Sequence, residues 1–499
     1  MIKKLPFWIL CTIGLAGFSQ EIKRIELINA EVLEYDESKG DKIKRLKGDV
    51  VFKHEGLTMY CDSAYLSSAT NTLDAFSNVR IMQGDSLQID GDYLNYKGNT
   101  KRSELINNIR LKHLDMVLTT DYLIHDLNTG IASYFNGGQI TDTDNRLTSK
   151  TGHYNLSNYT LFFKDSVYLE NPEYTMESDT LNYNTKTKTA YFQGPTSIIS
   201  NQNKIYCKNG WYNTLSNSSM FSGQATIFTG KKSITADSLY YYRNQGHGIA
   251  YGNVIMHDSI ERIIISGGFA DYYELEDRAL VTKNAMLTDI YAGDSLFLHA
   301  DTFITSLDST GHKLILAYHK VRFYKTNLQG VCDSISYSLK DSTVHLFNNP
   351  FLWSEANQMQ ADFIRLYSGE KGIELLEFNQ NAFISSRVDS GLYNQIKGKD
   401  MWGYFGGNEL KKIKVLGNGQ TIYYPKNEDE SIIGVNKADC SDMWIYVNEN
   451  IIEKISFLTQ PAATLYPLNE IAKEDLILQG FKWNGYQRPL NRRDIFIWR

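Results

Sequence analysis

The sequence predicts an all-β fold built as an elongated array of about 13 repeats, each about 29 residues long. Three observations predict it. A short motif returns at a regular spacing through most of the 499 residues. The composition favours strands, because 33 Tyr and 23 Phe accompany only 8 Pro. Apolar and polar residues alternate between turn formers, which is typical of half-buried strands.

The first nineteen residues are predicted to be a cleaved signal peptide. Lys3 and Lys4 precede the apolar run 5–18, and the small residues Gly17 and Ser19 form a small-x-small cleavage site. An uncleaved anchor is the alternative. Because no later segment has eighteen uninterrupted apolar residues, an exported and soluble mature chain is expected.

The charge balance argues against a nucleic-acid partner. The formal net charge is -6, and loss of Lys3 and Lys4 with the signal peptide would make it -8. Phosphate binding is driven by surplus Lys and Arg, which this chain lacks. With 42% hydrophobic and 22% charged residues, the chain fits neither a disordered protein nor an integral membrane protein.

The repeat motif reads apolar-x-small-acid-x-apolar-x-aromatic. It is clearest at 28–35, 89–96, 176–183 and 234–241. Counted at the position of the acid, which Lys replaces at 150, 208 and 399, the copies lie at positions 31, 62, 92, 121, 150, 179, 208, 237, 268, 301, 333, 362 and 399. The five steps from 92 to 237 are each 29 residues, which defines the period.

A second element follows most markers after 15 to 17 residues and begins a return strand. Examples are Gly48, Asn78, Asn108, Gly138, Gly223 and Gly252. Within the motif, the inward positions run i, i+2, i+5 and i+7, so the inward face changes phase at the acid. A skipped residue in a strand indicates a β-bulge or corner. Stacked corners predict two sheets that meet along an edge and enclose an apolar groove.

The repeat array is assigned to residues 20–405, and residues 406–499 are expected to form an irregular capping or docking region. The region ends with Trp483, Arg488 and Trp498 among further arginines. It could close the end of the array, or it could dock a partner, since Arg and Trp suit interfaces. One short helix is possible over 467–478.

Motifs that resemble catalytic sites are interpreted as structural. Gly-Asp-Ser-Leu occurs at 84–87 and at 293–296, in equivalent places of the repeat, where a turn leads into a strand. A catalytic Ser needs a paired base and an oxyanion site, and one copy suffices. The aligned acids are spread over the whole array, and the ten His show no metal-binding spacing. No catalytic residue, metal or cofactor is therefore expected.

The cysteines are expected to remain free. Cys61, Cys207 and Cys332 each occupy the small position before the corner charge, several repeats apart, beyond the roughly 7 Å between Cα atoms that a disulfide allows. They are interpreted as small core residues. Cys440 has no evident partner in the sequence.

The motifs at 28–35, 89–96 and 234–241, with the Gly-Asn-Val return at 252–254, resemble the OstA-like (LptA-type) family of lipopolysaccharide transport. The resemblance covers roughly residues 25–405. It implies a twisted, open β-jellyroll whose groove shelters the acyl chains of lipid A while the sugar stays in water. Mapped onto this sequence, the groove positions would be Ile28, Leu33, Ile89, Leu94, Leu118, Leu123, Ile205, Ile234, Leu239 and Ile265.

The resemblance implies a non-catalytic lipid-binding bridge in the periplasm that serves the outer membrane. Its implied partners are lipopolysaccharide and other transport proteins of the inner and outer membrane, and head-to-tail self-assembly stays open. One alternative is a structural or adhesive β-solenoid with a packed core and no lipid. Another is a polysaccharide-cleaving enzyme on a β-helix, which would need acids and bases gathered at one repeat.

Overall fold

The computed structural model describes residues 23–35, 43–290, 294–369, 372–406, 409–448 and 451–498. The chain divides into two compact units: unit 1 ends at Thr187 and unit 2 begins at Lys188. The predicted signal peptide, residues 1–19, lies outside the described residues. In these ranges, no helix is both long enough and apolar enough to cross a membrane.

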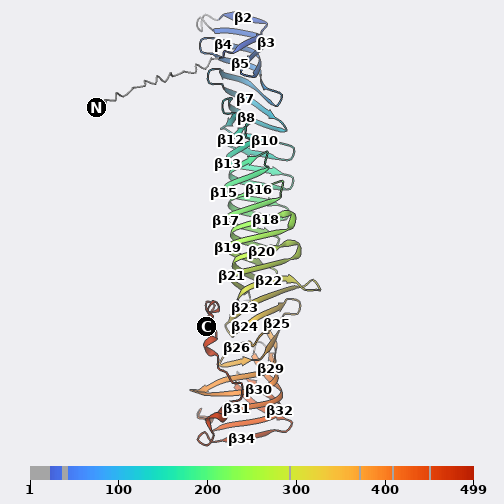
Figure 1. Cartoon of the computed structure of the whole chain (residues 1–499), viewed down its shortest axis with the longest axis vertical. Helices are drawn as coiled ribbons and strands as arrows, with labels where there is room; N and C mark the ends of the chain where they lie inside the picture. Colours follow the sequence, from blue (N-terminus) through green and yellow to red (C-terminus); the bar gives the residue numbers. More distant parts are fainter. Residues whose placement is uncertain are drawn as a thin grey trace, which may run out of the picture. The chain divides into compact units, whose positions relative to one another are not determined.

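Unit 1 consists of antiparallel strands that stack in chain order (Figure 1). Its strands are β1 (Glu26–Asn29), β2 (Val32–Tyr35), β3 (Ile43–His54), β4 (Leu57–Ser67), β5 (Thr72–Gln83), β6 (Leu87–Lys97), β7 (Arg102–His113), β8 (Met116–Asp126), β9 (Ile131–Tyr134), β10 (Gly138–Thr141), β11 (Arg146–Ser149), β12 (Thr151–Asn155), β13 (Thr160–Asn171) and β14 (Tyr174–Asn184). Two repeats are interrupted at the corner, so that β9 and β10 both pair with β8, and β11 and β12 both pair with β13.

Unit 2 has the same antiparallel arrangement (Figure 1). Its strands are β15 (Thr189–Ser200), β16 (Asn203–Asn213), β17 (Ser218–Thr229), β18 (Lys232–Tyr242), β19 (His247–Asp258), β20 (Ile263–Tyr273), β21 (Arg278–Asp289), β22 (Leu296–Leu307), β23 (Lys313–Lys325), β24 (Leu328–Ser338), β25 (Thr343–Phe347), β26 (Phe351–Ser354), β27 (Asn357–Gln360), β28 (Phe363–Gly369), β29 (Gly372–Asp389), β30 (Leu392–Gly406), β31 (Glu409–Tyr423), β32 (Val435–Asn448), β33 (Ile451–Leu458) and β34 (Ala462–Tyr466). Strands thus continue beyond residue 405, where the sequence placed the end of the array.

The long strands bend at β-bulges, as the phase change in the motif predicted. In β5, the register with β6 shifts between Phe76 and Val79, because Ser77 and Asn78 form the bulge with φ of 62° and 50°. A matching pair of positive φ values recurs at 107–108. A bulge kinks its strand, and successive bulges fold the sheet along one line into two walls.

The two walls of each unit face each other across an apolar interior. In unit 1, wall A carries the cross-strand ladder Leu46, Ala64, Ala75, Leu94 and Leu105, and wall B carries Phe52, Met59, Ile81, Ile89 and Leu111. In unit 2, wall A carries Leu239, Ala250, Ala270, Val281 and Phe303, and wall B carries Ile227, Ile234, Met256, Ile265 and Leu287. The predicted all-β fold, with two sheets around an apolar interior, is confirmed. The side opposite the corners, where the free edges of the walls meet solvent, is called the mouth.

The segment after β34, residues 467–498, is called the tail, and it packs against the outer face of wall B in unit 2. Gln395 and Gln358 each hold the tail backbone by a donor and an acceptor bond. Gln395 donates to the Leu476 carbonyl at 2.8 Å and accepts from the Leu478 N–H at 2.9 Å. Gln358 donates to the Lys482 carbonyl at 2.6 Å, and its Oε1 accepts from a tail N–H at 2.7 Å.

Of the short helix that the sequence allowed over 467–478, the structure has a four-residue 3-10 helix at Lys473–Leu476, which has no side-chain cap. Helices shorter than roughly 12 residues are marginal in isolation. Here the backbone bonds instead to glutamine side chains of the neighbouring strands, and Leu478 packs beside Phe383 and Tyr424.

Candidate functional site

Unit 2 contains an open apolar groove between its walls. Two cavities occupy it, with volumes of ≈470 Å³ and ≈510 Å³, and Ile315 lines both. In the first cavity, wall B contributes Ile234 and Ile265, while wall A contributes Ala279 and Ile315. The second cavity continues along the same ladders with Leu287, Leu298, Phe323, Phe303, Ala317, Ile335 and Leu346.

Small side chains on wall A help to leave this space open. Near the mouth, the cross-strand ladder of wall A runs through Gly248, Tyr272, Ala279, Thr305 and Ile315. Opposite them, wall B presents branched and long apolar side chains. Ala279 and Thr305 are small neighbours in this ladder and both line the first cavity, so they leave room at this level.

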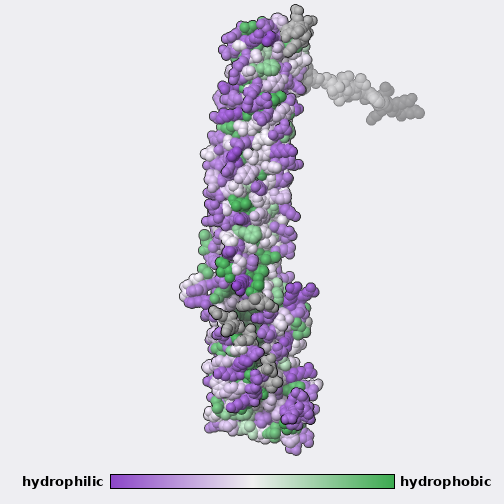
Figure 2. All heavy atoms as spheres, turned by 180° about the vertical axis from the view of Figure 1, so that it is seen from behind, coloured by the Kyte–Doolittle hydropathy of each residue, from purple (hydrophilic) through white to green (hydrophobic). Residues whose placement is uncertain are grey.

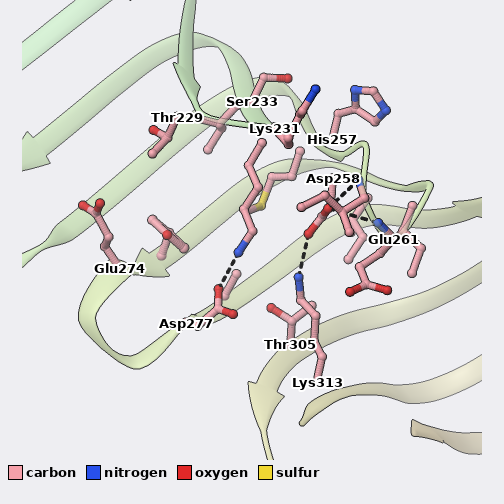
Figure 3. Close-up of a pocket in the computed structure, with 18 of the residues that line it drawn as sticks. Thr229, Lys231, Ser233, His257, Asp258, Glu261, Glu274, Asp277, Thr305 and Lys313 are labelled. Atoms are coloured by element: carbon pink, nitrogen blue, oxygen red, sulfur yellow. Dashed lines mark hydrogen bonds and ion pairs between the residues drawn. The ribbon is translucent and has the colours of Figure 1, made fainter. Parts of the chain in front are cut away.

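Two ion pairs cross the mouth of the first cavity. Lys313 Nζ lies 2.8 Å from Asp258 Oδ2 (Figure 3), and Lys232 Nζ lies 3.0 Å from Asp277 Oδ1. Lys313 and Asp277 belong to the edge of wall A, whereas Asp258 and Lys232 belong to the edge of wall B. These two pairs are called the mouth latches. Each joins the free edges of the two walls above the apolar floor.

The Lys313–Asp258 latch is the less exposed of the two. Its side chains are 19% and 14% exposed, against 44% and 35% for Lys232 and Asp277. Burial by itself would raise the pKa of Asp258, but the hydrogen bond from Lys313 and the N–H groups of Glu261 and Ile260 outweigh it and hold that pKa below its ordinary value. Asp258 is therefore ionised at neutral pH, and the latch is formed.

In unit 1, large side chains meet across the mouth. His54 Nδ1, at the edge of wall B, lies 2.6 Å from the hydroxyl of Tyr96 on wall A. His113 and Tyr154 repeat this contact at 2.7 Å. All four side chains are buried, and burial raises the pKa of Tyr154 to about 12. The interior of unit 1 is therefore closed at these levels by hydrogen-bonded ring pairs.

The predicted groove positions fall into distinct environments. Ile234 and Ile265 line the first cavity of unit 2. Ile205 is half-buried and pairs with Ile227, which also lines that cavity, while Leu239 is buried in wall A. The four positions Ile89, Leu94, Leu118 and Leu123 are fully buried in unit 1. The structure thus brings Ile234 and Ile265 together at an open groove and places these four in a closed interior.

Two predicted inward positions are exposed instead. Ile28 is 52% exposed, because the register of β1 with β3 shifts between Leu27 and Asn29, and Leu27 is the residue that pairs with the buried Phe52. Leu33 is 45% exposed although its partner Leu46 is buried. Leu33 belongs to β2, on which no further described strand packs from the other side.

Sequence reasoning missed the half of the groove that comes from the return strands. Met256 is the cross-strand partner of both Ile234 and Ile265 and lines the same cavity. Ile315 and Phe323 lie on β23 and were not assigned either. The available signal was the alternation after the second element, for example Val254-x-Met256, whose inward positions could have been assigned in the same way.

The features that resemble catalytic motifs have structural roles. Ser86 lies in an exposed turn between β5 and β6. The marker acids join the two halves of a corner: Asp92 Oδ2 accepts a hydrogen bond from Asn108 Nδ2 at 2.6 Å, and Asp237 accepts one from Asn253 at 3.0 Å. The acids therefore lie at corners, one repeat apart, rather than together at one site.

The face seen in Figure 2 is mainly hydrophilic, with hydrophobic side chains gathered at about the level of β19 to β22. This is the part of unit 2 whose interior holds the first cavity. Exposed apolar side chains in these strands and their connections include Tyr251, Ile255, Ile260 and Leu275. Of these, Ile260 also lines the first cavity, so this exposed apolar side chain belongs to the rim of the groove.

Comparisons with known proteins match each unit separately. A family model described as OstA-like protein matches residues 22–179, and a model described as LptA/(LptD N-terminal domain) LPS transport protein matches residues 204–371. Among solved structures, the chain is similar to LptH of Pseudomonas aeruginosa, described as the LptA-homologous periplasmic component of the lipopolysaccharide transport device. Identity is 12%, the match covers 23% of this chain and 81% of that chain, and the TM-score is 0.21.

A search of curated proteins finds no match. The two family models lie one in each unit and both describe the kind of protein that the repeat motifs resembled. The chain belongs to the OstA-like family of lipopolysaccharide-transport proteins.

Proposed function

We infer that this chain is a non-catalytic carrier that holds the acyl chains of lipopolysaccharide in the groove of unit 2 during transport to the outer membrane. The observation that carries the proposal is the pair of apolar cavities that share Ile315. Each falls within the roughly 300–1,000 Å³ of typical ligand sites. Acyl chains suit such a groove, since each CH₂ removed from water contributes about 0.8 kcal/mol.

The residue types at the mouth favour an amphiphilic ligand over a wholly apolar one. Charged side chains, including Lys232, Lys313, Asp258 and Asp277, line the rim, while the floor is formed mainly by isoleucine and methionine. A ligand with a polar head and hydrocarbon chains can keep its head in water beside the rim and bury its chains below. This division matches lipid A, and the membership of the family supports the same ligand.

The location and partners of the protein follow from the same proposal. The predicted signal peptide and the membership of the family support the periplasm as its place of action, with lipopolysaccharide and further transport proteins of the two membranes as partners. Unit 1, whose interior is closed by the His54–Tyr96 and His113–Tyr154 pairs, is not the lipid-holding part in this proposal.

A packed structural solenoid remains the second candidate, and unit 1 favours it. Its interior ladder residues Phe52, Ile81, Ile89 and Leu111 are fully buried. In unit 2, by contrast, the ladder residues line two open cavities, and Ile315 contributes to both. The two candidates therefore predict different behaviour at unit 2, where a test decides between them.

The test places a photo-crosslinking residue at Ile234 or Ile265 in cells that make lipopolysaccharide. Tyr240 is the matched control, because it lies on the same strand as Ile234, on the outer face, where its ring packs against Tyr251. We expect a lipopolysaccharide adduct at both groove positions and none at Tyr240. Adducts at neither groove position would reject the carrier and favour the packed solenoid.

A further inference from the structure

The end of the tail forms an exposed apolar surface beside a basic pocket of unit 2. Leu490, Phe496, Ile497 and Trp498 are 66%, 43%, 46% and 53% exposed. Ile495 between them is fully buried and anchors the segment. The buried Ile495 therefore fixes the position of this segment, while the four apolar side chains around it face water.

Basic side chains surround this surface. A pocket of ≈390 Å³ next to Phe496 and Trp498 is lined by Lys283, Lys320 and Arg322. One acidic residue, Asp301, also lines the pocket, and its carboxylate pairs with Lys320 at 3.2 Å. Three cations against one acid give the pocket a net charge of +2. The Arg322 guanidinium also lies 5.7 Å from the Trp498 ring centre, so pocket and tail form one continuous surface.

The last part of the chain is strongly basic, whereas the chain as a whole is acidic. Residues 482–499 contain five cations (Lys482, Arg488, Arg492, Arg493 and Arg499) and one acid, Asp494, a net charge of +4, whereas the chain as a whole carries -6. The side chains of Arg492 and Arg493 are exposed and make no hydrogen bond or ion pair with any residue that the structure describes. They are available to an external anionic partner.

We propose that this surface, formed by residues 490–498 with Lys283 and Lys320 and called the basic aromatic face, docks on an anionic phospholipid bilayer. Trp at the level of the headgroups, apolar side chains pointing into the interface and Arg or Lys beside them are what such a surface binds. The buried Ile495 and the hydrogen bonds of Arg322 to the Gln487 carbonyl and of Arg488 to Gln329 and the Glu355 carbonyl hold this end of the tail in place, so little ordering opposes docking. This face lies outside the groove and does not depend on its ligand.

The test measures binding of the full chain, without residues 1–19, to phosphatidylcholine vesicles with and without phosphatidylglycerol. We expect binding that needs the anionic lipid and falls in 0.5 M salt, because the charges are exposed and screened. Each basic residue near such a surface contributes about fivefold to affinity, so Arg492→Gln with Arg493→Gln should weaken binding about 25-fold.

The control is Arg110→Gln with Lys112→Gln, which removes two exposed cations from β7 in unit 1 and should leave vesicle binding unchanged. Thermal melting verifies that both double variants fold. Equal binding to neutral and anionic vesicles, or an unchanged affinity after loss of Arg492 and Arg493, would overturn the proposal. So would capture of an acidic protein without vesicle binding. The crosslinking result at Ile234 is independent of all these outcomes.

Discussion

At the residue scale, the marker acids show how a short motif specifies a corner. Asp92 and Asp237 each accept a hydrogen bond from an asparagine 16 residues later, Asn108 and Asn253. Both asparagines have positive φ, 53° and 46°, a conformation in which Asn is enriched. The acid of one strand thus fixes the bulge of the next, which explains why the motif and its return element keep a constant spacing.

His125 is a polar residue of unit 1 whose burial is energetically unfavourable. It is fully buried in β8, and neither ring nitrogen has a hydrogen-bond partner among the residues described. Burial lowers the pKa of His125 to about 4. An unfolded histidine has a pKa near 6.5, so between pH 6.5 and 4 only the unfolded chain takes up the proton. The free energy of unfolding therefore decreases as pH falls through this window, by about 3 kcal/mol in total.

His125→Leu should remove this pH dependence and stabilise the protein. We expect the free energy of unfolding to rise by about 1–3 kcal/mol, because an unsatisfied buried polar ring is replaced by an apolar side chain. Urea unfolding at pH 7.5 and at pH 5 measures both effects. His312→Leu, in an exposed turn, is the control and should change neither value. An unaltered difference between the two pH values in His125→Leu would contradict the assignment.

At the scale of elements, the edges of the walls decide whether the interior is open. In unit 1 the edges meet through buried ring pairs, and in unit 2 they meet through the two mouth latches. A pair of ions above a cavity can separate when a headgroup passes, whereas the buried His–Tyr ring pairs, which meet edge to face or tilted, fill the interior itself. In the carrier proposed above, the latches are the elements that must open for a ligand to enter or leave the groove.

Lys313→Met should accelerate ligand release from unit 2. The variant keeps the aliphatic stem of the side chain but removes the ion pair with Asp258. Loss of a partly exposed pair is worth about 1 kcal/mol, so the release rate of a fluorescent fatty acid should rise about fivefold. Stopped-flow displacement measures this rate.

Lys320→Met is the matched control for that experiment. Lys320 pairs with Asp301 at 3.2 Å, but this pair lies at a corner and not at the mouth. Its loss should leave the release rate as in the parent protein. An equal acceleration in both variants would indicate a general loosening of unit 2 and would contradict the role of the latch.

At the scale of the whole molecule, the four described cysteines are buried and free. They are Cys61 in unit 1 and Cys207, Cys332 and Cys440 in unit 2. Burial raises the pKa of Cys61 and of Cys207 to about 12 in each case. Because the thiolate is the reactive form, these thiols should be unreactive in the folded protein.

Alkylation of the chain without residues 1–19 should therefore proceed slowly at pH 8 and reach four thiols only in denaturant. A reducing agent should leave the melting temperature unchanged, since no disulfide contributes to stability. Mass spectrometry after timed alkylation checks the first expectation and calorimetry the second. Rapid labelling of the native protein, or a lower melting temperature with reductant, would disagree with the buried free thiols.

The sequence by itself determined the strands, their period and the corners. Period-two alternation, the marker acids and their return elements depend on residues that are close in the chain or one repeat apart, so they can be recognised without a structure. The same motifs indicated the family. Ile28 shows the limit of this reasoning, because a single bulge in β1 exchanged the inward position for Leu27.

Only the tertiary structure decided where the interior is open and where the tail lies. Tyr96 and Tyr241 occupy the same final position of the motif, yet Tyr96 meets His54 across the mouth, whereas Tyr241 donates to Glu274 at 2.7 Å. The partner of each tyrosine comes from another strand, and the tail bonds to glutamines about 80 to 125 residues earlier in the chain. A cavity depends on which side chains from two separate walls meet, and the alternation pattern of a single strand does not contain that information.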